Sequence, residues 1–227
     1  MNNYEIVIPT MDKPHRKICE AFLPKNVDVH WVREGNSWPE AVNIGFSKVK
    51  PGNDVMLMDD DIFLPPKIKI PSELYAKGDI FGFKLLFPNG IIQHAGGVFM
   101  GGGIRHRYFG EADNGQADHP AYVCHVTTSF CYIKANVLKE LKGMAMDYKG
   151  LQFEDVDFCF RALKAGFKIL YVPEMAVHLE SASKKSLPLF NTRMAVNQNE
   201  VRRRFLEDPA FVNVLQQYPI PVQAVNV

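Results

Sequence analysis

The sequence lacks a Cys-x-x-Cys pair, an excess of either charge and a long uninterrupted apolar run. Its four dispersed cysteines argue against a zinc or redox motif and favour reduced core thiols in a cytosolic protein. With 26 Lys and Arg against 25 Asp and Glu, no overall positive field favours nucleic-acid binding. No run reaches the roughly 18 apolar residues of a membrane span, and no signal-type segment opens the chain. We therefore expect a cytoplasmic protein with at most peripheral membrane contact.

The chain does have the composition and patterning of one globular domain. Of its 227 residues 47% are hydrophobic, which is enough for a sizeable core. In the first half, short β-branched runs alternate with helical patterns. These segments cover residues 4–8, 16–22, 27–33, 39–48 and 54–58. Their alternation predicts an α/β fold with a mostly parallel central sheet and flanking helices.

The second half is less regular. Strand patterns cover residues 79–86, 91–99, 122–134 and 168–172, and helical patterns cover 135–141, 154–166 and 198–217, the last with a break near Pro209. The glycine-rich, polar stretch from Gly101 to Pro120 is predicted to be a long loop. We expect this loop to be a mobile lid that orders over a bound ligand, with Arg105, His106 and Arg107 able to reach the ligand's phosphate or other oxygens.

Three consecutive carboxylates, Asp59, Asp60 and Asp61, follow an apolar run that is typical of a strand covered on both faces. They repel one another, so a fold keeps them together where a cation or hydrogen-bond donors compensate. Ligands bind at the carboxyl ends of strands in open α/β sheets. The three residues therefore indicate oxygen ligands for a hard divalent ion, completed by a substrate diphosphate. A solvated acidic turn is the alternative.

A second acidic cluster begins the helix predicted from Glu154. Apolar residues at helical spacing place Glu154, Asp155 and Asp157 in its first turn, where the helix dipole favours negative charge. Asp157 and Arg161 lie one turn apart, which favours a structural ion pair. His178 stands alone farther along the chain, and an isolated histidine is more often structural than a ligand.

Taken together, these residues resemble the motifs of family 2 glycosyltransferases of bacterial polysaccharide type, which have the GT-A fold. The run from Leu57 to Asp61 looks like their DxD motif, and residues 154–161 look like their ED motif. His178 looks like their metal-binding histidine. The segments Ile92-Gln93-His94-Ala95-Gly96-Gly97 and His178-Leu179-Glu180-Ser181-Ala182-Ser183 extend the resemblance, which covers residues 4 to about 190.

The resemblance implies an inverting, metal-dependent glycosyltransferase that moves a sugar from a nucleotide diphosphate sugar to a glycan or related hydroxyl acceptor. It implies one Rossmann-like GT-A domain over residues 1–227, with a nucleotide-sugar-binding half to about residue 95. A smaller acceptor and catalytic half would follow over about 96–190, and a C-terminal helix and tail over 191–227. The implied process is polysaccharide biosynthesis.

The same resemblance assigns roles to individual residues. Asp155 is the implied general base, and Glu154 beside it is the second catalytic candidate. Asp61 and His178 are implied to hold Mn or Mg against the diphosphate. The implied donor-binding residues are Pro9, Thr10, Glu34, Asn43, Asp59 and Asp60, with Asp59 accepting a ribose hydroxyl.

The region implied to contact the nucleotide base departs from the family. Pro9-Thr10-Met11-Asp12 and Arg33-Glu34-Gly35-Asn36-Ser37 stand where the family carries a Pro-x-Tyr-Asn-type turn and an Asp-x-x-Ser-x-Asp-type segment. Two alternatives remain: a non-catalytic nucleotide-sugar or glycan-binding domain, and a metal-dependent nucleotidyltransferase. The latter normally carries a glycine-rich loop after its first strand, and residues 8–12 contain no glycine.

Overall fold

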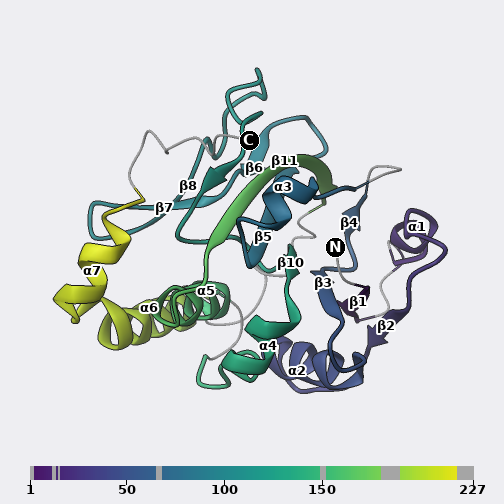
Figure 1. Ribbon diagram of the computed structural model, residues 1–227, viewed down its shortest axis with the longest axis horizontal. Helices are drawn as coiled ribbons and strands as arrows, with labels where there is room; N and C mark the ends of the chain where they lie inside the picture. The colour runs from purple at the N-terminus through teal and green to yellow at the C-terminus, as the bar shows by residue number, and fades with distance from the viewer. Residues whose placement is uncertain are drawn as a thin grey trace.

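A mixed β-sheet forms the centre of this computed structural model, which describes residues 3–11, 14, 16–64, 68–148, 152–179 and 190–218 (Figure 1). The sheet order is β2 (Val29–Val32), β1 (Tyr4–Pro9), β3 (Asp54–Met58), β10 (Phe130–Ile133), β5 (Ile80–Leu86), β11 (Ile169–His178) and β4 (Ile62–Phe63). Parallel pairing joins β2, β1 and β3, and also β5 and β11, while β10 lies antiparallel between the two groups. The predicted α/β fold is thus confirmed.

Helices cover both faces of the sheet because its central strands are apolar on both sides. Along β3, Val55 and Leu57 pack in one cluster with α2 (Trp38–Lys48), α4 (Ala135–Leu141) and α5 (Glu154–Lys164). The alternate residues Met56 and Met58 pack in a second cluster with α1 (Arg16–Ala21) and α3 (Ser72–Tyr75). This alternation follows from the two-residue period of a strand, and it makes β3 a rigid support for the carboxylates that follow it.

The strand predicted over residues 91–99 is divided in the structure. It forms β6 (Ile92–His94), which pairs with β5, and β7 (Gly97–Met100), which pairs with β8 (Gly103–His106) in a separate hairpin. Gly96 lies at the division with φ +84°, a conformation that favours glycine. The pattern over 122–134 is likewise divided, into β9 (Ala121–Tyr122) beside β11, and β10.

The segment from Gly101 to Pro120 is more structured than the long loop that its composition predicts, while its role as a mobile lid stays a prediction. Residues 101–106 form the turn and second strand of the β7–β8 hairpin, and the later part of the segment is anchored to the sheet. The buried Lys84 of β5 donates to Asp113 (2.9 Å) and to Asp118, and Tyr171 of β11 donates to the carbonyl of Ala117 (2.7 Å). Burial alone would lower the pKa of Lys84, but its hydrogen bonds to both carboxylates raise that pKa above its ordinary value. A lysine that is 5% exposed needs these partners, which is why the segment is held.

Lys84→Met is expected to lower the free energy of unfolding by about 1–2 kcal/mol, since it removes the cation that pairs with two carboxylates. The value is modest because Asp113 and Asp118 are partly exposed and water screens them. Urea unfolding measures the change, and limited proteolysis should show new cleavage within residues 107–120. Lys50→Met, which removes an exposed ion pair with Asp28, is the matched control and should change neither result. Equal stability of the two variants would contradict the anchoring role of Lys84.

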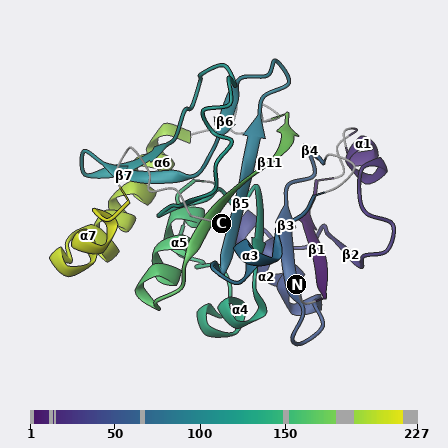
Figure 2. The same cartoon turned by 45° about the horizontal axis from the view of Figure 1, so that its top comes forward.

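The C-terminal helices lie beside α5, on the side of the molecule opposite β1 and β2 (Figure 2). They are α6 (Phe190–Val201), the π-helical turn η1 (Arg202–Leu206) and α7 (Pro209–Leu215), so the predicted break near Pro209 is confirmed. Phe160 of α5 packs against Phe205 and Phe211. Across the described ranges, no helix is long and apolar enough to span a membrane. Residues 219–227 of the predicted tail, Asp12, and residues 180–183 of the segment beginning at His178 lie outside the described residues.

Candidate active site

A cavity of about 1060 Å³ lies at the carboxyl ends of β1, β2 and β3. Its opposite wall is formed by the start of α5, by β8 and by residues 125–129. This is where an open α/β sheet places its ligand site. The sequence-predicted residues that line it are Pro9, Thr10, Glu34, Asp59, Asp60, Asp61, Arg105, His106, Glu154, Asp155 and His178.

Asn43 is not among the described residues that line this cavity. Its side-chain nitrogen donates to the carbonyl of Met144 (3.0 Å), and its oxygen accepts from the Met144 amide (2.7 Å). Both polar groups of the amide are therefore used to join α2 to the segment after α4. The structure gives Asn43 this scaffold contact and does not bring it to the other predicted donor-binding residues.

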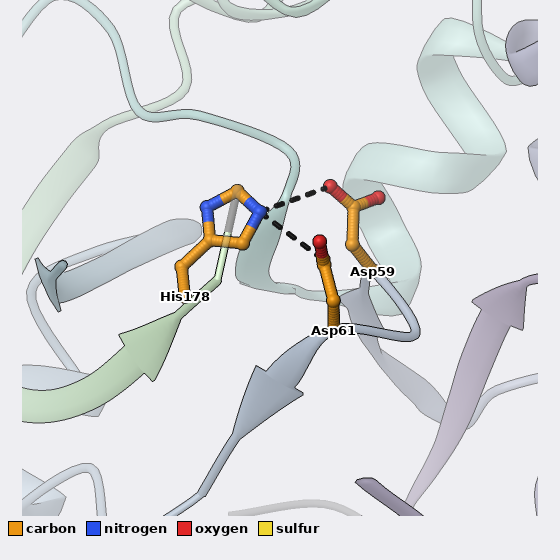
Figure 3. A group of neighbouring side chains, drawn as sticks. All are labelled: Asp59, Asp61 and His178. Carbon is orange, nitrogen blue, oxygen red and sulfur yellow. Dashed lines mark ion pairs between the residues drawn. The ribbon is translucent and has the colours of Figure 1, made fainter. Parts of the chain in front are cut away.

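Asp59, Asp61 and His178 form a group that could hold a divalent metal ion (Figure 3). One ligand atom from each lies within 4.8 Å of the others. His178 Nε2 is 3.2 Å from Asp61 Oδ1 and 3.9 Å from Asp59 Oδ2. The register of β11 against β4, in which His178 pairs with Ile62, brings the histidine beside these carboxylates. Asp61 and His178 were predicted as ligands, and the structure adds Asp59, for which a ribose contact was predicted.

The surroundings of this group fit a cation. Trp38 donates from Nε1 to Asp59 Oδ1 (3.1 Å), which fixes that carboxylate while its Oδ2 lies toward His178. Gln93 Oε1 accepts from His178 Nδ1 (2.7 Å), so the proton of a neutral ring lies on Nδ1 and the Nε2 lone pair lies near the two carboxylates. In the neutral ring this lone pair faces two carboxylates, and a cation among the three groups relieves that repulsion. Two carboxylates and one imidazole are suitable ligands for a divalent ion.

Gln93→Leu is expected to weaken Mn²⁺ binding by about 10- to 100-fold, because it removes the acceptor that orients His178. Titration calorimetry with Mn²⁺ alone measures this loss without any assay of turnover. Gln93→Glu is the matched variant. It retains an acceptor oxygen for His178 Nδ1, so it should bind Mn²⁺ more tightly than Gln93→Leu does. Wild-type affinity in Gln93→Leu would show that Gln93 does not orient the ligand.

Asp60 lies against a different neighbour from Asp59 and Asp61. Its Oδ2 accepts from Thr10 Oγ1 (2.6 Å), so two of the predicted donor-binding residues meet at the end of β1. Glu34 lies at an exposed part of the cavity wall and accepts from Lys48 Nζ (2.8 Å). That hydrogen bond lowers the pKa of Glu34 to about 2. Asp60 and Glu34 on this wall therefore have separate partners, Thr10 and Lys48.

Asp155 is held at the start of α5 by an unusual backbone turn. Gln152 and Phe153 both have positive φ (91° and 72°), and Asn197 of α6 donates to the carbonyl of Gln152 (2.9 Å). Strained backbone of this kind persists where the surrounding structure enforces it, often at functional sites. The turn allows Asp155 to line the cavity, while Asp157, two residues on, is fully buried.

Both carboxylate oxygens of Asp155 have close polar neighbours. Oδ1 accepts from the amide of Val156 (2.8 Å), and Oδ2 lies 3.1 Å from His125 Nε2. Burial is the largest single influence and raises the pKa of Asp155, but His125, His106 and the amide of Val156 together outweigh it, and the pKa is lowered overall. Asp155 is therefore ionised at neutral pH and available to accept a proton.

Asp157 has the structural role that its spacing predicted. Its carboxylate accepts from Arg161 Nε (2.6 Å), from Tyr148 (2.9 Å) and from Arg204 (2.8 Å). These partners come from α5 itself, from the segment after α4 and from η1. Asp157 therefore links three parts of the second half, and the predicted Asp157–Arg161 pair is confirmed.

Three histidines, His94, His106 and His125, also line the cavity beside Asp155. Their ring centroids lie 4.8 to 5.8 Å apart. Burial, followed by the charges of His106 and His125, lowers the pKa of His94 well below its ordinary value. His94 and His106 fell within segments that the sequence singled out, but no motif or spacing marks His125, whose place depends on long-range packing.

Part of the chain matches a known protein family and a curated relative. The family model described as "Glycosyltransferase like family 2" matches residues 102–200. Uncharacterized protein y4gI of Sinorhizobium fredii is 28% identical over an alignment that covers 57% of this chain and 16% of that protein. The chain thus spans a small part of the length of this curated relative.

Two solved structures show the fold. The mannosyltransferase PcManGT from Pyrobaculum calidifontis, in complex with GDP-Man and Mn²⁺, has a TM-score of 0.59 at 11% identity, covering 95% of this chain and 68% of that one. GalNAc-T7 with UDP, GalNAc and Mn²⁺ has a TM-score of 0.56 at 14% identity, covering 78% and 44%. The chain therefore has the GT-A fold of these glycosyltransferases, and its residues 102–200 match the glycosyltransferase-like family 2 model.

Proposed function

We propose that this protein is an inverting, divalent-metal-dependent glycosyltransferase that moves a sugar from a nucleotide diphosphate sugar to a hydroxyl of a glycan acceptor. One observation carries the proposal: a single cavity holds the Asp59, Asp61 and His178 group together with the ionised carboxylate of Asp155. The first set suits a diphosphate with its cation, and the second suits removal of a proton from an acceptor.

The donor is assigned to the wall formed after β1, β2 and β3. Pro9, Thr10 and Glu34 line that wall, and Asp60 is held there by Thr10. Asp59, Asp61 and His178 would hold Mn²⁺ or Mg²⁺, which when bound neutralises the charge of the leaving diphosphate. The two similar structures contain Mn²⁺ with a nucleotide or nucleotide sugar, which supports this assignment. Most of the donor site lies before residue 95, but His178 comes from the second half.

The acceptor is assigned to the wall that carries Asp155. In the proposed reaction, Asp155 takes the proton of the acceptor hydroxyl while the hydroxyl oxygen forms a bond to the anomeric carbon. The bond from that carbon to the diphosphate oxygen breaks in the same displacement, which inverts the anomeric configuration. Glu154, adjacent in the first turn of α5, is the second candidate for the base. We further propose that the acceptor belongs to polysaccharide biosynthesis and that the protein is cytoplasmic.

A product test separates this function from its alternatives. The protein is incubated with UDP-, GDP- and dTDP-sugars and with nucleoside triphosphates, with and without Mn²⁺. Release of a nucleoside diphosphate from a sugar donor, dependent on Mn²⁺ and on an added glycan, supports the transferase. Release of pyrophosphate from a triphosphate indicates a nucleotidyltransferase, and binding without any release indicates a binding domain.

A further inference from the structure

His125 lies in a tightly packed position beside the candidate base. It follows β9, and 1% of its side chain is exposed. Its main chain pairs with Gly97 at the start of β7, where the Gly97 amide donates to the His125 carbonyl (2.7 Å). A Cβ atom at Gly97 would lie 2.7 Å from His125 Nδ1, which is closer than real Cβ contacts occur. The glycine at position 97 therefore makes room for this imidazole ring.

The other neighbours of the ring fix its orientation. The rings of His94 and His106 pack against it with centroids 5.8 and 5.5 Å away. In this position His125 Nε2 lies 3.1 Å from Asp155 Oδ2. Because an ionised carboxylate can only accept hydrogen bonds, the nitrogen that faces it carries a proton. Val156 donates to Oδ1 and the His125 ring contacts Oδ2, so both oxygens of Asp155 have a close polar neighbour and rotation of the carboxylate is restricted.

We propose that His125, seated against Gly97, is the positioning residue of Asp155 and holds its carboxylate in the orientation that receives the acceptor proton. The proposal rests on the proposed function, since it assigns a partner to the base of that reaction. A histidine that served packing alone would be replaceable by another ring of similar size. A positioning residue is replaceable only by a side chain that supplies a donor at the same place.

His125 also affects the ionisation of Asp155. The other groups that face this carboxylate are His106 from β8, the amide of Val156, and the buried thiols of Cys131 and Cys159. Burial raises the pKa of both thiols, so they stay uncharged and do not replace the effect of His125. Removing His125 should therefore raise the pKa of Asp155. The acidic limb of the pH profile of kcat/KM, where the base becomes protonated, should move to higher pH.

The test compares His125→Phe with His125→Gln in the full chain, assayed with the nucleotide sugar that supports turnover. Phe keeps a ring of similar size without a donor, whereas Gln offers an amide N–H near the position of Nε2. We expect kcat of His125→Phe to fall about 10- to 100-fold with an unchanged KM for the donor, and its acidic limb to move to higher pH. His125→Gln should recover part of both changes. His119→Phe, at an exposed position that does not line the cavity, is the matched control.

A second pair of variants tests the seat of the ring and does not depend on the folding of His125→Phe. Gly97→Ala should displace His125 and reproduce the loss of kcat, whereas Gly103→Ala in the same hairpin meets open space and should be neutral. Wild-type kcat and pH profile in a folded His125→Phe, or equal activity of the two alanine variants, would overturn the proposal. Loss of turnover in Asp155→Asn without loss in His125→Phe would refute the positioning role alone. Full turnover in Asp155→Asn would refute the proposed function itself.

Discussion

Asp61→Asn is expected to reduce sugar transfer by at least about 10²- to 10³-fold, while the folded protein remains as stable as the wild type or becomes more stable. The side chain of Asp61 is 6% exposed, and its Oδ1 lies 3.2 Å from His178 Nε2. Its replacement removes one of two anionic ligands from the candidate metal group, so the negative charge of the diphosphate loses its counter-charge. Initial rates over a range of Mn²⁺ concentrations measure the effect, and calorimetry with Mn²⁺ alone measures the loss of affinity.

The expected stability follows from electrostatics in the absence of metal. Asp59 and Asp61 are like charges held close together, and removing one of them relieves repulsion in the folded state. A site that binds a cation thus reduces the stability of the metal-free protein. Asp28→Asn, at an exposed position outside the cavity, is the control and should change neither turnover nor Mn²⁺ affinity. Wild-type activity of Asp61→Asn that a chelator still abolishes would show that the metal is held elsewhere.

The elements that depend on local sequence were predicted well. The helical patterns over 135–141 and 154–166 correspond to α4 and α5, and Gly166, with φ +84°, lies just past the end of α5. The four cysteines are buried and unpaired. The alternation of strands and helices before residue 58 predicted parallel pairing, and β2, β1 and β3 do pair in parallel because a helix joins each of these strands to the next along the chain.

Where the structure differs from the sequence-based expectation, contacts between distant residues are the reason. Asn43 is held by Met144, 101 positions away, and no local pattern around α2 indicates that partner. The segment 101–120 has the composition of a mobile loop, but Lys84 of β5 fixes it through Asp118, 34 positions along the chain. The composition of the segment shows that it is polar. It does not show that Lys84, buried in another part of the chain, requires Asp113 and Asp118 as partners.

The site shows the same division between local and long-range information. Asp59, Asp60 and Asp61 were found because three carboxylates at the end of an apolar strand are unusual by themselves. His178 needed the family resemblance, since its approach to Asp61 depends on the register of β11 against β4. His125 had neither signal. The role of Gly97 in admitting its ring explains one glycine of the segment Ile92-Gln93-His94-Ala95-Gly96-Gly97 in terms that only the packed structure supplies.

Asp155→Asn should lower turnover by about 10²- to 10⁴-fold and leave the binding of Mn²⁺ and of nucleoside diphosphate close to that of the wild type. Asparagine keeps the size of aspartate and an oxygen that can accept from Val156, but it cannot take a proton at neutral pH. The pKa of Asp155 is below its ordinary value, so the wild-type base stays ionised as the pH falls until that lowered pKa is reached. Steady-state rates across pH measure the loss, and calorimetry measures the binding.

Asp157→Asn is the matched comparison, two residues farther along the same helix. Asp157 is fully buried and pairs with Arg161 and Arg204, so this variant should lower the free energy of unfolding by about 2–4 kcal/mol. Asp155→Asn should lose catalysis with little loss of stability, because the side chain of Asp155 lies at the cavity and is 20% exposed. Collapse of nucleotide affinity together with the rate in Asp155→Asn would place this carboxylate in the donor site. Unchanged rate and affinity in Asp155→Asn would transfer the role of the base to Glu154. Glu154→Gln would then have to abolish turnover. If it did not, an inverting displacement at this cavity would be contradicted.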